Sequence, residues 1–199
     1  NELGCNKNIL LEFVSANPTG PLHVGHGRGA VFGDCLSNLL GFSGYNVTKE
    51  YYVNDAGKQI MILSLSVLYR YHELINENFK KFFKDFYQGD YIWDISAHLH
   101  REYGDIFFIE NLENIKLDDL DQTILEVKNN LKDKFEILSE ESVNYIIQDI
   151  NKTLVNIDVN FDNWYLESDL LKSDMLRKTL DKLESKNMIE KKEGALWFK

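Results

Sequence analysis

Apolar and polar positions in residues 1–75 alternate between strand-like runs and a helical period. Residues 9–14 form a short apolar run, and residues 47–53 are rich in residues of high β-propensity. Each run is followed by apolar positions on one face of an α-helix. The first face holds Val24, Val31, Phe32, Cys35, Leu36, Leu39 and Leu40, with Gly41 at the expected C-terminus, and the second holds Ile60, Leu63, Val67, Leu68 and Tyr71. The pattern predicts two strand–helix units of a parallel sheet.

The pattern changes after residue 75. Residues 76–138 mix aromatic and acidic stretches and predict short helices joined by loops. A longer helical apolar face follows Ser142, and Ser173 is placed to cap a further helix. Apolar residues flank the polar segment 191–194, which predicts a β-hairpin. The chain is therefore expected to hold a sheet-forming region followed by a mainly helical one.

The loop between the first strand and the first helix is the most informative part of the chain. It contains both prolines of the sequence, Pro18 and Pro21, so residues 17–22 should form an extended, rigid turn. His23 and His26 follow three residues apart, which places both on one face of the first helical turn. Unpaired N–H groups and the positive end of the helix dipole attract anions there. The arrangement predicts that the two imidazoles hold the phosphoryl oxygens of a nucleotide.

Three glycines, Gly25, Gly27 and Gly29, alternate through the same part of the helix. Each weakens the helix by about 0.5–1 kcal/mol relative to alanine, and each lets a ligand or a neighbouring backbone approach closely because it has no Cβ atom. The residues alone leave other interpretations open, namely two metal-ligating histidines, plain surface histidines, or glycines that serve close packing only. The strand before the motif and the helix after it favour the phosphate-binding interpretation.

Two polar segments are expected at the same edge of the predicted sheet. Residues 15–26 follow the first strand, and residues 54–57 follow the second. Ligands of an open parallel sheet bind outside the carboxyl ends of its strands. We therefore expect both segments to contribute to one site.

Composition narrows the class of protein only slightly. Hydrophobic residues make up 44% and charged residues 27% of the 199 positions, as in ordinary globular proteins. The net charge of −10 argues against autonomous RNA binding, because nucleic-acid binders normally present a basic face. No apolar run reaches 18 residues, so no membrane span is expected. Cys5 and Cys35 form no disulfide framework, which is typical of a reducing cytoplasm, and Cys35 is expected to be buried.

Several strings resemble one known family. Residues 23–26, HVGH, resemble the HIGH signature of class I aminoacyl-tRNA synthetases, and residues 12–34, EFVSANPTGPLHVGHGRGAVFGD, resemble the arginyl-tRNA synthetases in particular. Later strings follow in that family's order: YYVNDAGKQI (51–60), YQGDYIWDIS (87–96), FDNWYLES (161–168) and EGALWFK (193–199). The resemblance covers essentially the whole chain.

The resemblance implies an α/β fold in two regions. Residues 1–75 would be the first half of a Rossmann-type nucleotide-binding domain that carries the HIGH motif. Residues 76–199 would be a connective insertion, mainly helical with an α+β character and a C-terminal hairpin. The family's second half of the catalytic domain and its tRNA-contacting domains have no counterpart in these 199 residues.

The resemblance also implies a function. The family joins L-arginine to tRNA(Arg) through an arginyl-adenylate, with ATP as a substrate and Mg²⁺ on the phosphates of ATP. It implies that His23 and His26 are catalytic and that they bind ATP together with Gly25 and Gly27. A cytoplasmic, monomeric enzyme without membrane association is expected, and no metal is expected to be held by the protein's own side chains.

The same resemblance assigns the arginine substrate to Glu12, Ser15 and Asn17. The Glu12 carboxylate would pair with the guanidinium group, since such pairs can be bidentate. Ser15 and Asn17 would hold the α-amino and carboxylate ends of the amino acid. From the residues alone, Glu12 could instead be an exposed charge at a strand end, and Asn17 a turn-forming residue before proline.

Four more residues are further candidates for the site. Asp55, Gly57 and Gln59 resemble another motif of the family, although Asp55 is equally placed to cap its own helix. Arg28 is either a surface contact for phosphate or a member of an internal ion pair. The sequence does not decide between these two roles.

The two ends of the chain suggest a segment of a longer polypeptide. The sequence begins at Asn1 rather than Met and ends on the apolar run 196–198, which is typical of a strand with a partner. We therefore expect the chain to be inactive alone. Two other function classes are an HxGH nucleotidyltransferase that adenylylates a small phosphate ester, and a non-catalytic fragment that binds RNA or protein. The long insertion after Gln59 argues against the first, and the acidic balance argues against autonomous RNA binding.

Overall fold

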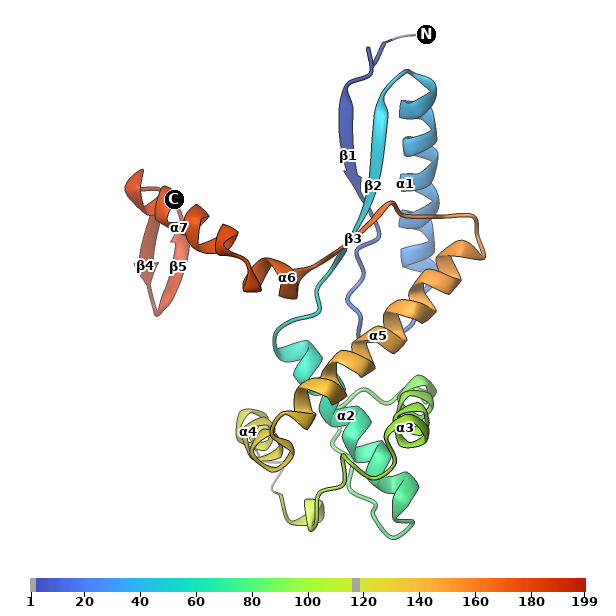
Figure 1. Ribbon diagram of the computed structural model, residues 1–199, viewed down its shortest axis with the longest axis vertical. Helices are drawn as coiled ribbons and strands as arrows, with labels where there is room; N and C mark the ends of the chain where they lie inside the picture. Colours follow the sequence, from blue (N-terminus) through green and yellow to red (C-terminus); the bar gives the residue numbers. More distant parts are fainter. Residues whose placement is uncertain (1–2, 116–118) are drawn as a thin grey trace.

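A parallel sheet forms the upper part of the molecule in Figure 1. The computed structural model describes residues 3–115 and 119–199. Within them, β1 (Asn8–Glu12), β2 (Asn46–Val53) and β3 (Asn163–Leu166) form one sheet in the order β1-β2-β3, and both pairings are parallel. The register places Glu12 beside Glu50 and Tyr52 beside Tyr165. The predicted parallel α/β arrangement is confirmed to this extent.

Helix α1 (Val24–Phe42) connects β1 to β2 and lies along one face of the sheet (Figure 1). Its buried residues are small: Ala30, Gly33 and Ser37. A Cβ atom on Gly33 would lie 2.2 Å from the ring of Phe13, so the helix backbone approaches the end of β1 as closely as only glycine permits. The face of α1 with small side chains is therefore the one that packs against the sheet.

The apolar face that the sequence marks on α1 is largely exposed, with Leu36 and Leu40 half-buried. Phe32 is 71% exposed and Phe42 82% exposed, and Val24, Val31 and Leu39 are exposed as well. The Cys35 thiol, expected to be buried, is exposed too. The physical reason is the close contact at Gly33, which turns the larger side chains of the helix away from the sheet.

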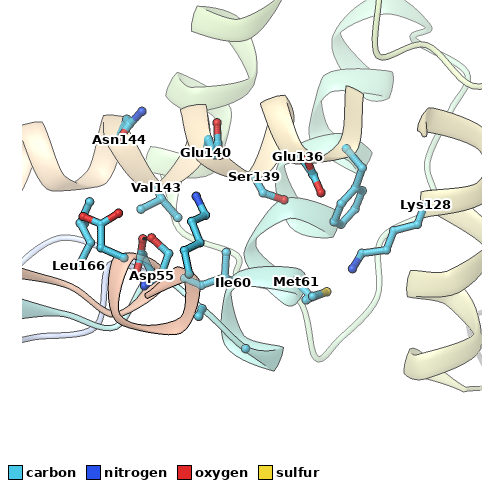
Figure 2. A pocket seen from close by; sticks show the side chains of 16 residues that line it. Asp55, Ile60, Met61, Lys128, Glu136, Ser139, Glu140, Val143, Asn144 and Leu166 are labelled. Atoms are coloured by element: carbon cyan, nitrogen blue, oxygen red, sulfur yellow. Dashed lines mark hydrogen bonds between the residues drawn. The ribbon is translucent and has the colours of Figure 1, made fainter. Parts of the chain in front are cut away.

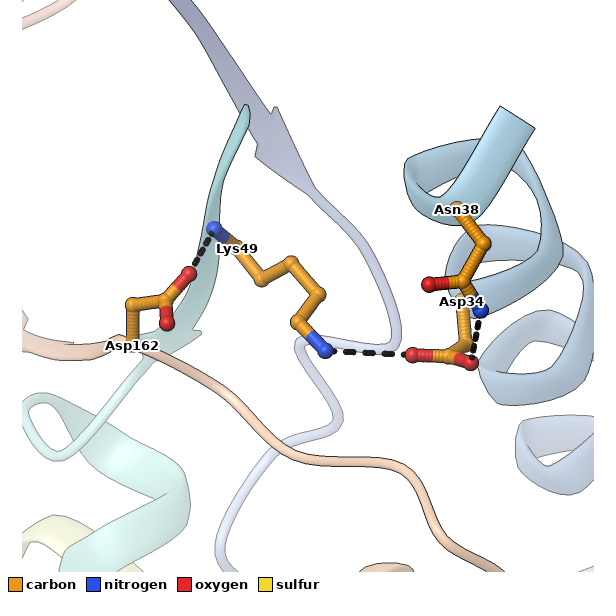
Figure 3. Close-up of polar contacts among 4 residues, drawn as sticks. All are labelled: Asp34, Asn38, Lys49 and Asp162. Carbon is orange, nitrogen blue, oxygen red and sulfur yellow. Dashed lines mark hydrogen bonds and ion pairs between the residues drawn. The ribbon is translucent and has the colours of Figure 1, made fainter. Parts of the chain in front are cut away.

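An ion pair joins α1 to the middle of the sheet. Lys49 on β2 extends its Nζ to Asp34 Oδ1 at 3.1 Å, and Asn38 donates to the other oxygen of Asp34 at 2.9 Å (Figure 3). The main-chain N–H of Lys49 donates to Asp162 Oδ2 at 2.7 Å, just before β3 begins. Lys49 thus ties together α1, β2 and the segment leading into β3.

Most of the apolar core lies in the helical region below the sheet in Figure 1. Helix α2 (Lys58–Ile75) follows β2 directly and packs against both α3 (Asp90–Tyr103) and α5 (Lys134–Val155). The short helix η1 (Leu112–Asn114) and α4 (Leu120–Leu131) complete this region. Large side chains fill the interior between these helices, among them Leu63, Leu68, Tyr69, Tyr71, Ile95, Leu99, Phe107 and Leu138.

Helix α5 begins earlier than predicted. The sequence predicts a start after Ser142, but the helix starts at Lys134, because Phe135 and Leu138 extend the same buried face and no glycine or proline interrupts it. From the helical region, α5 runs back toward the sheet, and the segment after it leads into β3 (Figure 1). A strand from the second predicted region therefore completes the sheet of the first, and the division at residue 75 stays a prediction.

The last part of the chain extends to one side (Figure 1). It comprises α6 (Glu167–Lys172), α7 (Asp174–Ser185) and a hairpin of β4 (Ile189–Lys192) and β5 (Ala195–Phe198). The predicted cap is confirmed, because the Ser173 hydroxyl accepts from the N–H of Met175 at 3.3 Å, and so is the predicted hairpin. Among the described residues, no helix combines the length and apolarity that a bilayer crossing requires.

Candidate functional site

The three strands deliver three polar segments to one edge of the sheet. The loop after β1 leads to the histidines, the turn after β2 carries Asp55, and β3 leads directly into α6 at Glu167. This is the carboxyl edge of a parallel sheet, where ligands bind in open α/β folds. Asn17 Nδ2 donates to Gln59 Oε1 at 2.9 Å, so the loop after β1 contacts the first turn of α2, directly after residues 54–57. That residues 15–26 and 54–57 contribute to one site stays a prediction.

The loop after β1 is held by β2 through main-chain and side-chain contacts. The Ser15 hydroxyl accepts from the N–H of Tyr52 at 3.1 Å, and the Tyr51 hydroxyl donates to the Ala16 carbonyl at 3.0 Å. Val14 and Ser15 both adopt positive φ values, 65° and 38°. Such values cost energy in residues other than glycine, so the surrounding contacts must hold the turn in place.

Tyr91 of α3 fixes the next part of the loop. Its hydroxyl donates to the Thr19 carbonyl at 2.8 Å. Its ring fits between two glycines, because a Cβ on Gly20 would lie 3.1 Å from the Tyr91 oxygen and a Cβ on Gly89 would lie 2.3 Å from the Tyr91 Cε1. Burial raises the pKa of Tyr91 to about 12, so the hydroxyl remains a donor at neutral pH.

His23 and His26 cap the first turn of α1 reciprocally. His23 is the N-cap residue, and its Nδ1 accepts from the N–H of Gly25 at 3.1 Å. His26 Nδ1 accepts from the N–H of His23 at 3.3 Å. The two rings stack with their centroids 3.7 Å apart. Because each Nδ1 is an acceptor, the neutral rings carry their protons on Nε2, and no hydrogen bond among the described residues uses either Nε2.

The surroundings of His26 favour its neutral imidazole. The pKa of His26 is lowered, first by burial and second by the neighbouring charge of His23 when that ring is protonated. The first turn of α1 contains no acidic residue. The helix end therefore keeps its positive potential, with two oriented N–H donors, and this environment suits an anion such as a phosphoryl group.

A cavity of about 290 Å³ opens beside the histidines. Its lining residues come from the loop, from the start of α1, from the segment before α3 and from the first turn of α3: Asn17, Thr19, Gly20, Pro21, His23, His26, Tyr87 and Tyr91. We call this space the histidine cavity. Tyr87 and Tyr91 were not predicted as site residues, although both lie within the string 87–96 that carries part of the resemblance.

The glycines of the motif have different environments. A Cβ on Gly25 would lie 2.9 Å from the His23 ring, so Gly25 is needed for the capping geometry. A Cβ on Gly27 or Gly29 would meet nothing within 4 Å, so both positions are open to an approaching group. Binding of ATP by Gly25 and Gly27 stays a prediction.

The residues predicted to bind arginine are not gathered in one place. Asn17 lines the histidine cavity, whereas the Ser15 hydroxyl is engaged with β2. Glu12 is exposed at the end of β1 and lies beside Glu50. Since Phe13 faces α1 and successive strand residues point to opposite faces, Glu12 lies on the face away from α1.

Asp55 does not cap its own helix. The N-cap of α2 is Gly57, at φ 85°, and no side chain caps it. The Asp55 carboxylate instead accepts from the main-chain N–H of Ser168 at 2.8 Å and from the Ser168 hydroxyl at 2.5 Å, so it caps α6 from another element. Arg28 is exposed and makes no ion pair with the residues that the structure describes, so contact with phosphate remains its predicted role.

A second cavity of about 480 Å³ lies between the start of α2 and the N-terminal half of α5 (Figure 2). Ile60 and Met61 line one side, and Glu136, Ser139 and Glu140 of α5 line the other (Figure 2). It includes Asp55 and Gly57 but neither histidine. Across residues 3–115 and 119–199, no group of three or more His, Cys, Asp or Glu side chains is arranged to hold a metal ion.

The comparisons with known proteins agree on one family. The catalytic domain of the class I tRNA synthetases (R) matches residues 1–198. The arginine–tRNA ligase of Thioalkalivibrio sulfidiphilus is 40% identical over 211 residues, and that of Aquifex aeolicus is 38% identical over 213 residues. Both alignments cover the whole chain, but the chain spans only 36% of the length of each relative.

A solved structure extends the likeness to the fold. A crystal structure described as an arginyl-tRNA synthetase from Campylobacter jejuni matches 96% of this chain and 37% of its own length, with a TM-score of 0.76 and 33% sequence identity. The match of the family over 198 residues is decisive, because it spans the histidine motif, the helical region and the hairpin together. The chain belongs to the arginyl-tRNA synthetase family of class I catalytic domains.

Proposed function

We propose that this chain forms the ATP-binding part of an arginine–tRNA ligase and acts within a longer polypeptide. In that protein, L-arginine would be joined to tRNA(Arg) through an arginyl-adenylate. The observation that carries the proposal is the reciprocal capping of His23 and His26, which presents two Nε2–H donors at the positive end of α1. The share of the relatives' length that the chain spans, about 36%, fits one part of such an enzyme.

The first reaction step requires stabilisation of negative charge. A carboxylate oxygen of arginine attacks the α-phosphorus of ATP, a new O–P bond forms, and pyrophosphate leaves with the electrons of the broken bond. Such transfers are catalysed mainly by positioning and by electrostatic stabilisation of the phosphoryl oxygens. The Nε2–H groups of His23 and His26 would donate to these oxygens, and their fixed tautomer lets them do so without rearrangement.

The second step transfers the arginyl group. A terminal ribose hydroxyl of the tRNA attacks the carbonyl carbon of the adenylate, AMP leaves, and the hydroxyl loses its proton. Asn17 lines the histidine cavity and would hold an end of the amino acid, while Glu12 would pair with the guanidinium group. Glu12 lies on the face of the sheet away from α1. The guanidinium group would therefore extend past the carboxyl end of β1 to contact it.

Mg²⁺ would enter with the phosphates of ATP. Mg²⁺ keeps several waters and is usually bound by substrate phosphates and one or two carboxylates, rather than by a dedicated protein cage. None of the steps assigned to this chain's residues depends on the ion.

Exchange of labelled pyrophosphate into ATP tests the proposal. The complete polypeptide should catalyse exchange with arginine when tRNA is present and with no other amino acid. The 199-residue chain alone should show none, because it spans only about 36% of the length of its relatives. Exchange driven by a different amino acid would refute the substrate, and turnover by the isolated chain would refute the need for a longer polypeptide.

A further inference from the structure

We propose that Tyr87 is a further binding residue of the histidine cavity and that it contacts the adenosine portion of a substrate. That portion belongs either to ATP or to the terminal nucleotide of the tRNA. The inference rests on the proposed function, because both substrates of that reaction present an adenosine. Tyr87 has no role predicted from the sequence, and its position in the cavity follows only from the folding of the helical region against the loop.

The main chain at Tyr87 is fixed from two sides. Its N–H donates to the hydroxyl of Ser66 on α2 at 2.9 Å, and that hydroxyl donates in turn to the Ile62 carbonyl at 2.7 Å. The preceding residue, Phe86, is buried and packs edge-to-face on Tyr69. The segment therefore holds the Tyr87 side chain at the cavity before any ligand arrives, and such preorganisation lowers the cost of binding.

The two tyrosines of the cavity differ in one respect. The Tyr91 hydroxyl is committed to the Thr19 carbonyl, whereas no hydrogen bond of the described residues uses the Tyr87 hydroxyl. The Tyr87 side chain is half-buried and lines the cavity. The Tyr91 hydroxyl thus stabilises the loop that forms one side of the cavity. Tyr87 has a ring and a hydroxyl that are available to a ligand.

The polar and aromatic groups that line the cavity indicate a ligand with a phosphoryl group and a nucleoside. One part of its lining carries the imidazole donors of His23 and His26, which suit a phosphoryl group, and another carries the phenol of Tyr87. A phenol ring can stack on a base, and its hydroxyl can bond to a ribose or base atom. The volume of about 290 Å³ lies near the lower end of the range for small-molecule sites, so the cavity suits an adenosine with an adjoining phosphoryl group rather than a whole nucleoside triphosphate.

Steady-state kinetics of the complete polypeptide test the inference. Tyr87→Phe keeps the ring and removes the hydroxyl, and Tyr87→Leu removes both. Tyr87→Phe should raise a KM by about 3- to 10-fold, and Tyr87→Leu by about tenfold or more. The ATP KM is measured by pyrophosphate exchange and the tRNA KM by aminoacylation, each at saturating concentrations of the other substrates. A rise in the ATP KM assigns the contact to ATP, and a rise in the tRNA KM assigns it to the terminal nucleotide.

Tyr145→Phe is the matched control. Tyr145 lies on α5, where its ring packs on His98 away from the histidine cavity, so both KM values should stay within about twofold of the unaltered enzyme. If Tyr87→Phe also leaves both KM values within twofold in an enzyme that is active with arginine, the role of Tyr87 is refuted while the proposed function stands. Loss of arginine-dependent exchange in the unaltered enzyme would instead refute the proposed function itself.

Discussion

Asn17 and Gln59 lie 42 positions apart in the sequence, and a hydrogen bond of 2.9 Å joins their side chains. Asn17 follows β1 and lines the histidine cavity, whereas Gln59 lies in the first turn of α2. The bond links the loop that leads to the histidines with the helix that leads into the apolar core. The position of the loop should therefore depend on this pair of side chains.

Removing either side chain breaks the hydrogen bond that positions the loop. Removing both should lower kcat/KM no further than the more damaging of the two single changes. Asn17→Ala and Gln59→Ala are each expected to lower kcat/KM for pyrophosphate exchange in the complete polypeptide. A double-mutant cycle should show a coupling of about 0.5–1 kcal/mol, which is the usual value of one hydrogen bond. Strictly additive losses would mean that the bond does not operate in the enzyme.

His26 can be tested for its donor and its cap separately. In His26→Asn, the amide oxygen would lie near the position of Nδ1 and keep the cap, but the Nε2–H donor would be lost. His26→Asn and His26→Ala should therefore both lower kcat by about 100-fold or more. Only His26→Ala should also lower the melting temperature, because it removes the acceptor for the His23 N–H. An unchanged kcat in either variant would remove His26 from the mechanism.

His72 should make the protein sensitive to acid. Burial lowers its pKa to about 4, and the Phe107 carbonyl and Glu113 act more weakly in the opposite direction. Its Nε2 accepts from the N–H of Ile109 at 3.2 Å, so the folded state requires the neutral ring. Because the unfolded state binds the proton first as pH falls below 6.5, stability is lost between pH 6.5 and about 4.

The size of that loss follows from the shift in the pKa of His72, and it should reach about 3 kcal/mol at the acid end of the interval. Chemical unfolding of the 199-residue chain at a series of pH values measures it. His72→Gln is expected to be less stable at neutral pH and to show a flatter dependence between pH 6.5 and about 4. The same slope in both proteins would show that other groups control the acid transition.

Gly33 should be the least replaceable glycine of α1. A Cβ there would lie 2.2 Å from the Phe13 ring, so Gly33→Ala should force α1 away from β1 and cost about 1–3 kcal/mol. Gly41→Ala is the control, because a Cβ at that position meets nothing within 4 Å and alanine favours the helix by about 0.5–1 kcal/mol. Urea unfolding should show opposite signs for the two changes. Equal signs would contradict the close approach of α1 to β1.

The local structure of the site could be predicted from neighbouring residues alone. Two prolines and the helical period after His23 were sufficient to predict a rigid loop and a helix whose first turn carries both histidines, because these features depend on short-range backbone preferences. The hairpin of β4 and β5 and the cap at Ser173 were predictable for the same reason. The resemblance to one family also rested on contiguous strings, and the match over residues 1–198 confirmed it.

Which surfaces meet could be learned only from the folded molecule. The apolar period of α1 marks one face and led us to expect a buried Cys35, but contact with Phe13 through Gly33 leaves most of that face outward, since packing depends on the partner as well as on the helix. Asp55 caps a helix 113 positions away at Ser168, and Tyr87 and Tyr91 reach the histidines from the helical region. Contacts between residues so distant in sequence leave no period or spacing in the chain, so they appear only when the fold brings the elements together.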